Sequence, residues 1–308
     1  MNSYSEKNGF GLKAISNLKR ALSLFLLLLT VCNLNAQKKE NVISFDIGSF
    51  IITLLSEGQR AGNKDILIGA TDDMLQTTVP DGTFPMAINA FLVEADGKTI
   101  LFDAGLGMEL FNNLKTYKKT PADIDAIVLT HMHGDHIGGL LHNEVKSFPN
   151  AELYIPQAEY DYWTNDNEQE SSERARKVIA AYKDKLHLFV PGSIDNMQEL
   201  FPGIRSIAAY GHTPGHTGYL LESDHSKIFI CGDLMHAMAI QMPFPQVAVT
   251  YDVDPVKAVE SRQQLFNYLS TNKIKVAGMH LPFPAIGHLR KSKSHGYEFD
   301  LICDCESR

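Results

Sequence analysis

Five apolar runs in this chain of 308 residues each end beside an aspartate or a histidine: Asp103, His131, His216, Asp233 and His280. Helical patterns lie between most of these runs, so that strands and helices alternate along the sequence. This alternation is typical of a layered α/β fold, whose loops gather side chains around a cleft at one edge of the sheets. We therefore expect the five polar residues to lie close together.

Turn residues and periodicity predict the individual elements. Residues 89–94 and 99–103 are predicted to pair as a hairpin, because Asp96-Gly97 between them is a strong signal for a tight turn. The segment 62–85, which contains Pro80 and Asp81-Gly82, is predicted to be a long loop. No repeat or long flexible linker follows the first 36 residues, so residues 37–308 are predicted to form one domain. Helices are expected at 106–118, 157–163, 171–185 and 255–269.

The residues from His131 to His136 form the pattern His-x-His-x-Asp-His directly after the apolar run 127–129 and Thr130. A strand that leads into a short loop can present alternate residues in the same direction, so His131, His133, Asp135 and His136 can converge. Imidazole nitrogens and carboxylate oxygens bind zinc-like divalent ions in sites that activate water. The pattern predicts a metal site, and a polar surface loop is the alternative interpretation.

The first 36 residues have the three regions of a secretory signal peptide. Lys19 and Arg20 precede the apolar run 21–31, and Ala36 is a small residue suited to cleavage. We expect a secreted protein, with the periplasm as its destination and no stable membrane span, because the apolar run is about half the length that a bilayer requires. Lipoprotein anchoring at Cys32 is an alternative, disfavoured by the bulky Val31 before it.

The charge of the mature chain narrows the class of partner. Residues 1–36 carry four cationic residues and one acidic residue, so their removal changes the formal net charge from −8 to −11. An acidic surface disfavours nucleic acid and any charged phosphodiester as the main substrate. The three cysteines that remain, Cys231, Cys303 and Cys305, make no disulfide framework.

The motif His131–His136, followed in order by Thr213-Pro214-Gly215-His216, Gly232-Asp233 and His280, resembles the metallo-β-lactamase superfamily. The resemblance implies an αβ/βα four-layer sandwich of two mixed β-sheets flanked by helices. It also implies two Zn²⁺ ions, with other divalent metals as alternatives. The implied ligands are His131, His133 and His216 for one ion, Asp135, His136 and His280 for the other, and Asp233 between the two.

Further segments are similar to the methyl parathion hydrolase group of that superfamily: 89–93, 211–216, 237–244, 280–284, 286–290 and 296–297. This similarity implies hydrolysis of a neutral, apolar small molecule at a lactone, carboxylic ester or phosphotriester bond. A hydroxide bridging two ions would be the nucleophile, and Asp135 or Asp233 would handle a proton. One departure is Ala104, where much of the superfamily has a threonine that supplies a hydroxyl.

Three alternative functions remain open at this stage. β-Lactam hydrolysis uses the same hydroxide, although Asp135 and His280 do not match the second site of the enzymes with that activity. A mononuclear iron persulfide dioxygenase of the same superfamily would differ in its metal and would consume oxygen. A scaffold that binds metal without catalysis is disfavoured, because all seven ligand candidates are present.

Residues around the seven candidates receive supporting roles. Asp103 is expected to fix a ligand imidazole by a hydrogen bond, and His212 to brace its loop through the backbone. His236 and His288 are expected to have structural or rim positions. The segment 235–244 is a candidate pocket wall or, alternatively, a homodimer contact. Apolar loop residues that line either the pocket or the core are Phe84, Met86, Trp163, Met242, Phe244 and Phe283.

Overall fold

The computed structural model describes residues 41–165 and 170–302, and the chain from Asn41 onward forms one compact unit. The predicted signal peptide, Cys32, Cys303 and Cys305 lie outside the described residues. Among the described helices, none has the length and apolar character needed to cross a membrane.

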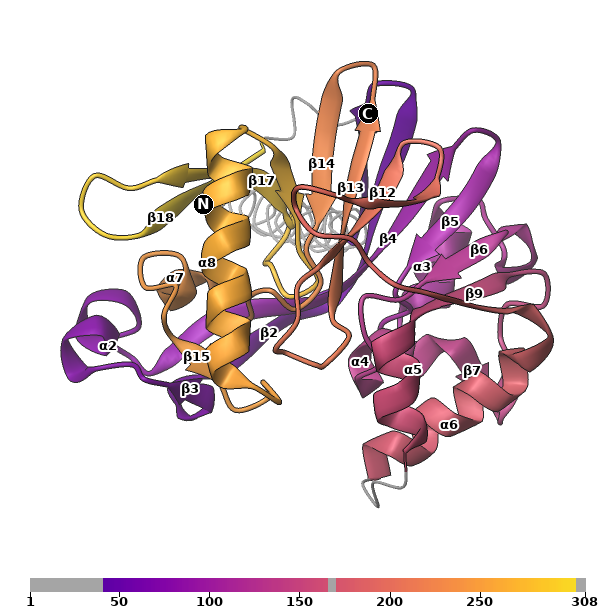
Figure 1. Ribbon diagram of the computed structural model, residues 1–308, viewed down its shortest axis with the longest axis horizontal. Coiled ribbons are helices and arrows are strands. Elements are labelled where there is room, and N and C mark those ends of the chain that lie inside the picture. Colours follow the sequence, from indigo (N-terminus) through magenta and orange to yellow (C-terminus); the bar gives the residue numbers. More distant parts are fainter. Residues whose placement is uncertain (1–40, 166–169, 303–308) are drawn as a thin grey trace, which may run out of the picture. The chain divides into compact units, whose positions relative to one another are not determined.

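Two seven-stranded mixed sheets make up the centre of the fold (Figure 1). In spatial order the first sheet contains β1 (Val42–Ile47), β2 (Phe50–Asn63), β4 (Thr83–Ala95), β5 (Lys98–Phe102), β6 (Ala126–Val128), β9 (Glu152–Pro156) and β10 (Leu186–Phe189). The second sheet contains β11 (Gln198–Phe201), β12 (Ile204–Ala208), β13 (Thr217–Ser223), β14 (Ser226–Ile230), β16 (Lys275–Ala277), β17 (Ile286–Lys291) and β18 (Tyr297–Leu301). Two small pairs join β3 (Leu67–Ile68) to β15 (Ala248–Val249) and β7 (Leu141–His142) to β8 (Val145–Lys146).

Helices lie against both sheets (Figure 1). The α-helices are α2 (Asp72–Thr78), α3 (Leu110–Thr116), α4 (Gly134–Ile137), α5 (Gln157–Thr164), α6 (Glu170–Tyr182), α7 (Met238–Gln241) and α8 (Pro255–Thr271). Short 3-10 helices are η1 (Lys64–Ile66), η2 (Pro121–Asp123), η3 (Gly138–Leu140) and η4 (Lys183–Lys185).

The alternation of side chains along β4 explains the layers. Successive residues of a strand point to opposite faces of the sheet. Phe91 and Val93 therefore enter the core between the two sheets, whereas Leu92 enters a second core that contains residues of α3, α5 and α6. Helix α8 contributes Leu265 and Phe266 to the core of the second sheet. The result is the predicted four-layer sandwich of two mixed sheets flanked by helices.

The predicted hairpin is confirmed as β4 and β5, with Asp96 (φ 49°) and Gly97 (φ 75°) in the turn. The prediction of a long loop over 62–85 was wrong, because this segment contains η1, β3 and α2. Thr71 caps α2 by accepting a hydrogen bond from the backbone N–H of Met74, and two aspartates occupy the first helical turn. This capping signal indicates a helix start, and the turn residues at 80–82 concealed it.

Strand ends from both sheets meet where the candidate site lies. Asp103 follows β5 and the His131–His136 motif follows β6, both in the first sheet. His212 and His216 lie in the loop between β12 and β13, Asp233 follows β14, and His280 follows β16. These polar residues are all buried except His133 and Asp135, which are partly exposed.

Candidate metal centre

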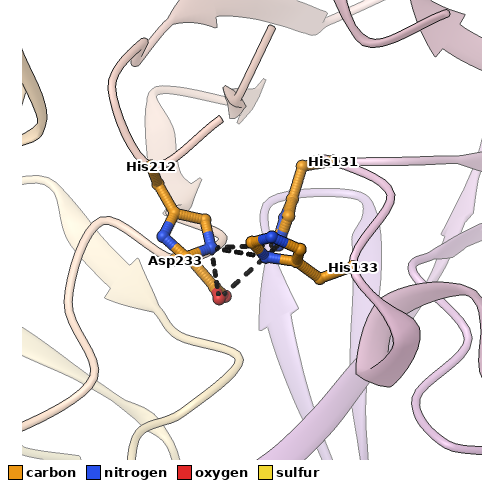
Figure 2. A group of neighbouring side chains, drawn as sticks. All are labelled: His131, His133, His212 and Asp233. Carbon is orange, nitrogen blue, oxygen red and sulfur yellow. Dashed lines mark hydrogen bonds and ion pairs between the residues drawn. The ribbon is translucent and has the colours of Figure 1, made fainter. Parts of the chain in front are cut away.

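A first group of four side chains comes from loops of both sheets: His131, His133, His212 and Asp233 (Figure 2). Each offers one ligand atom, and these atoms lie within 4.8 Å of one another. The Nδ1 of His133 is 3.0 Å from the Nε2 of His131 and 2.9 Å from the Nε2 of His212. His212 Nε2 is 3.1 Å from Asp233 Oδ2. Three ring nitrogens and one carboxylate oxygen therefore face a common point.

Hydrogen bonds on the outer side of the rings assign the tautomers of two of these histidines. The Thr130 hydroxyl donates to Asp103, so its oxygen accepts from His131 Nδ1–H at 3.0 Å. The Nδ1–H of His212 donates to Asp252 Oδ1 at 2.9 Å. Each ring therefore turns an unprotonated Nε2 toward the common point, as a metal ligand must.

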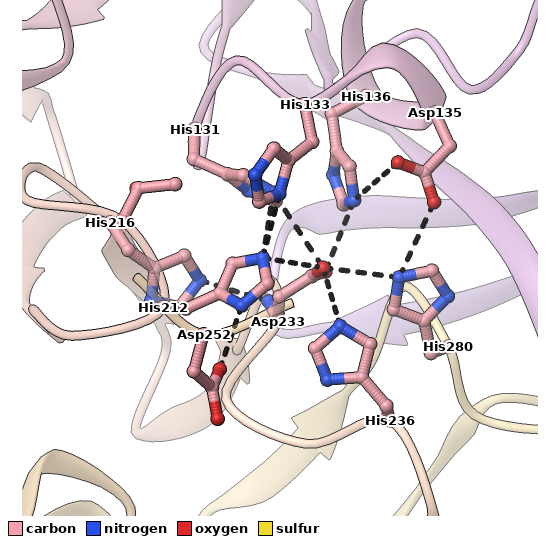
Figure 3. A network of polar contacts seen from close by, with 12 residues as sticks. His131, His133, Asp135, His136, His212, His216, Asp233, His236, Asp252 and His280 are labelled. Carbon is pink, nitrogen blue, oxygen red and sulfur yellow. Dashed lines mark hydrogen bonds and ion pairs between the residues drawn. The ribbon is translucent and has the colours of Figure 1, made fainter. Parts of the chain in front are cut away.

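A second group consists of Asp135, His136 and His280, next to Asp233 (Figure 3). His136 Nε2 lies 3.1 Å from Asp233 Oδ1, and His280 Nε2 lies 3.1 Å from Asp233 Oδ2. His280 Nε2 is also 3.6 Å from Asp135 Oδ2. The outer nitrogens are again engaged, since His136 Nδ1 bonds Asp103 Oδ2 at 2.7 Å and His280 Nδ1 bonds the carbonyl of Ala87 at 2.9 Å. Asp233 thus contacts both groups.

Two buried atoms at the junction of the groups, His136 Nε2 and Asp233 Oδ1, lie 3.1 Å apart and make no hydrogen bond. A buried polar atom without a partner is unfavourable, and a cation between the two would satisfy both. Burial opposes ionisation of Asp233, but the fields of His136, His280 and His131 outweigh it and hold the pKa of this carboxyl well below its usual range. The donor set of imidazoles and carboxylates is the one that suits zinc. The residues present therefore fit a divalent metal centre.

The structure does not bring His216, a predicted ligand, into the first group. Its Nδ1–H donates to the Ala209 carbonyl at 2.8 Å, and its Nε2 accepts from the backbone N–H of Asp233 at 2.9 Å. Both nitrogens are thus committed within the protein, and burial together with the nearby His212 lowers the pKa of His216 to about 3. His212, which the sequence assigned to loop bracing, instead offers the potential ligand atom in this group, while His216 accepts from the backbone of Asp233.

Two buried carboxylates orient the rings, and the sequence indicated only one of them. Asp103 fixes His136 as predicted, and it also accepts from the backbone N–H and the hydroxyl of Thr130. Asp252, which holds His212, was missed because it lies 40 residues from its partner in a loop without a recognisable motif.

His236 and His288 have different positions. His236 is buried inside the centre, where its Nε2 lies 2.9 Å from Asp233 Oδ2 and its ring stacks on His280 at 4.7 Å between centroids. Of the two expected positions, structural or rim, its burial fits the structural one. With Asp233 and His280 it forms a third group of potential ligands. His288 lies within β17, opposite Lys275, and belongs to none of these groups.

The apolar loop residues separate into core and site. Phe84 and Met242 are buried in the cores, and Met86, Phe244 and Phe283 are partly buried against them. Met235 and Ile240 are buried as well, so the segment 235–244 does not offer these side chains to a second copy of the chain. Trp163 packs edge-on against His133, with 5.5 Å between ring centroids. Tyr251, which the sequence did not indicate, is half-exposed beside His236.

Two mixed sheets flanked by helices, with histidines and aspartates converging at the strand ends, define an α/β metal-dependent hydrolase. The family model of the metallo-β-lactamase superfamily matches residues 83–270, and the chain belongs to this superfamily.

Two solved structures share the fold over most of the chain. The hydrolase AbOPH has 28% sequence identity and a TM-score of 0.78, covering 85% of this chain and 98% of that one. The dizinc quorum-quenching lactonase AidC, in complex with a product, has 26% identity and a TM-score of 0.78, with the same coverage. A probable metallo-hydrolase of Bacillus subtilis, YqgX, is 30% identical over 155 residues, which are 49% of this chain and 67% of that protein.

Proposed function

We propose that the protein is a dinuclear zinc hydrolase that opens lactones or cleaves carboxylic ester or phosphotriester bonds in neutral, apolar small molecules. The observation that carries this proposal is the pair of ligand groups that share Asp233. One ion would be held by His131, His133 and His212, and the other by Asp135, His136 and His280. Asp233 would bridge them.

When bound, two such ions lower the pKa of a shared water to near neutrality and polarise the substrate oxygen. The chain's own residues orient the ligand rings and exchange a proton with the leaving group. Asp103 and Asp252 hold ligand rings in the required tautomers. Asp135 keeps 30% of its side chain exposed, whereas Asp233 is 2% exposed. Asp135 is therefore the carboxylate placed to exchange a proton with the leaving group, and Asp233 serves to hold the site together.

Among the three substrate classes, we expect lactones to be the preferred substrates. The structurally similar AidC is described as a dizinc lactonase, and it matches this chain over nearly its whole length. The formal charge of −8 favours an uncharged substrate. A β-lactamase site with a cysteine ligand is disfavoured, because Cys231 is buried and its thiol donates to the carbonyl of Gly232.

The test combines metal analysis with a substrate panel on the purified protein. We expect about two equivalents of zinc and turnover of a lactone series, with slower turnover of carboxylic esters and methyl parathion and none of a cephalosporin. Removal of the metal should abolish turnover, and its return should restore it. Full activity of the metal-free protein, or iron together with oxygen uptake on a persulfide, would contradict the proposal.

We also propose that the chain is exported and that residues 1–36 are removed. The support is the order of cationic, apolar and small residues in that segment. Mass spectrometry of the periplasmic fraction should find a mature chain that begins at Gln37. A lipid-modified Cys32 would instead show membrane anchoring, and an intact leader in the cytoplasm would contradict export.

A further inference from the structure

Glu159 is a fully buried carboxylate on α5 that belongs to neither ligand group and that the sequence did not indicate. A buried carboxylate is costly unless charges or hydrogen bonds compensate it. Burial raises the pKa of Glu159, and four hydrogen bonds oppose this rise. All four partners are neutral donors, so hydrogen bonds alone, and no cationic side chain, hold this carboxylate beside the metal centre.

The four donors come from three separate segments. Oε2 accepts from the backbone N–H of Met132 at 3.1 Å and from the indole N–H of Trp163 at 2.6 Å. Oε1 accepts from the backbone N–H of Gly215 at 2.9 Å and from the hydroxyl of Thr213. One side chain thus joins helix α5 to both loops that carry the histidines of the first group.

Three of the four donors are adjacent to a histidine of that group, and the fourth, Gly215, directly precedes His216. Met132 stands between His131 and His133 in the sequence, and Thr213 directly follows His212. Trp163 packs its ring against His133. Every imidazole of the first group is therefore tied to Glu159 through a neighbour in the chain or a packed ring.

The backbone of the second loop approaches α5 closely enough to require glycine. A Cβ at Gly215 would lie 2.4 Å from the backbone nitrogen of Glu159, which is far closer than a real contact allows. The contact between the loop and the helix therefore requires both the glycine at 215 and the glutamate at 159.

We infer that Glu159 is a positioning residue that sets the spacing of His131, His133 and His212 and thereby the metal affinity of the first group. This inference rests on the proposed dinuclear function. The negative charge also favours a cation nearby, because the low polarity of the interior screens it weakly. The four hydrogen-bond donors to Glu159 include no residue of the second group, so the metal affinity of that group should depend on Glu159 much less.

Glutamine is the informative substitution because it keeps the shape and removes the charge. Three of the four partners are N–H groups that can only donate. An amide has one acceptor oxygen, so its NH₂ must face at least one of these donors. Glu159→Gln should therefore loosen one ligand loop without opening a cavity.

Trp163 provides a direct signal, because it is the only tryptophan in the sequence. Its indole N–H donates to Glu159 and its ring contacts His133, so its emission should change when a metal occupies the first group. This signal reports on metal binding without any assay of activity.

The experiment titrates the metal-free full chain with Zn²⁺ and follows Trp163 emission, with metal content measured in parallel. We expect Glu159→Gln to weaken one of two equivalents about 10- to 100-fold, the range typical for groups that support metal ligands. The control is Asp161→Asn, an exposed carboxylate on the same helix, which should bind like the wild type.

Thr213 provides a second pair of variants should Glu159→Gln not fold. Thr213→Ala removes one donor and should weaken the same equivalent, whereas Thr213→Ser keeps the hydroxyl and should restore the affinity. Equal affinities of wild type and Glu159→Gln, or of Thr213→Ala and Thr213→Ser, would overturn the role of Glu159. A wild-type protein that binds fewer than two equivalents would instead contradict the dinuclear function.

Discussion

At the scale of single residues, the two histidines of the loop 211–217 have opposite roles that only the folded structure separates. They stand four residues apart in the segment Gly-His-Thr-Pro-Gly-His-Thr, and the sequence predicts His216 as a ligand and His212 as a bracing residue. The distinction depends on hydrogen bonds to Asp252, Ala209 and Asp233. The sequence does not encode these partners locally. The remaining members of the two ligand groups were all predicted from the motifs.

Alanine substitution of each histidine should separate the two roles. His212→Ala should lose the metal of the first group and nearly all turnover, and it also removes the donor to the buried carboxylate of Asp252. His216→Ala leaves the buried N–H of Asp233 without an acceptor and should cost about 1–3 kcal/mol of stability. Metal content and denaturant unfolding of both metal-free variants measure these effects. Loss of metal confined to His216→Ala would reverse the assignment.

Gly232 is a second position where a single residue decides the geometry. Its φ of +54° favours glycine, and a Cβ there would lie 2.5 Å from His216 Nε2 and 2.9 Å from Thr130 Cβ. Gly232→Ala should destabilise the chain by more than about 1 kcal/mol and displace Asp233. Denaturant unfolding of the metal-free protein measures the cost. Gly134→Ala, where a Cβ meets open space, is the matched control.

At the scale of elements, the hairpin of β4 and β5 and most helices were predictable because their turn and cap residues are local. The irregularity in β2 was not predictable, because its hydrogen bonds join residues that are 49 to 53 positions apart in the sequence. The ladder shifts between Ser56 and Gln59, and Glu57 in this bulge accepts hydrogen bonds from the N–H groups of Leu106, Glu109 and Leu110. Glu57 thereby caps the start of α3 and supports the turn that follows Asp103.

Removal of this cap should loosen α3. Glu57→Ala should lower the free energy of unfolding by about 1–2 kcal/mol, which is typical for the loss of a helix cap. Calorimetry of the metal-free protein provides the measurement, with Glu144→Ala as an exposed control that loses only a surface ion pair. Equal stability of the two variants would show that the three N–H groups find other acceptors.

At the scale of the whole molecule, the layered fold was predictable because alternating apolar runs require a buried sheet on both faces. The pairing of the two sheets was not predictable, because it depends on packing between strands that are distant in the sequence.

The ligands come from both sheets, so a metal that binds only the native state should stabilise it. At a free concentration 100 times the dissociation constant this amounts to about 2.7 kcal/mol. A chelator should lower the melting temperature, and zinc should restore it; an unchanged melting temperature would argue against tight binding.

Tyr219 of the second sheet donates its hydroxyl to the carbonyl of Leu129, just before the histidine motif of the first sheet, and its ring packs on Phe102 at 5.2 Å. The distance between the two halves of the centre is consequently governed by how the sheets stack. A substitution in the buried layer between them can alter catalysis without touching a ligand or the substrate. Substitutions in the interior, as well as substitutions in the loops, can therefore change the substrate preference of this chain during evolution.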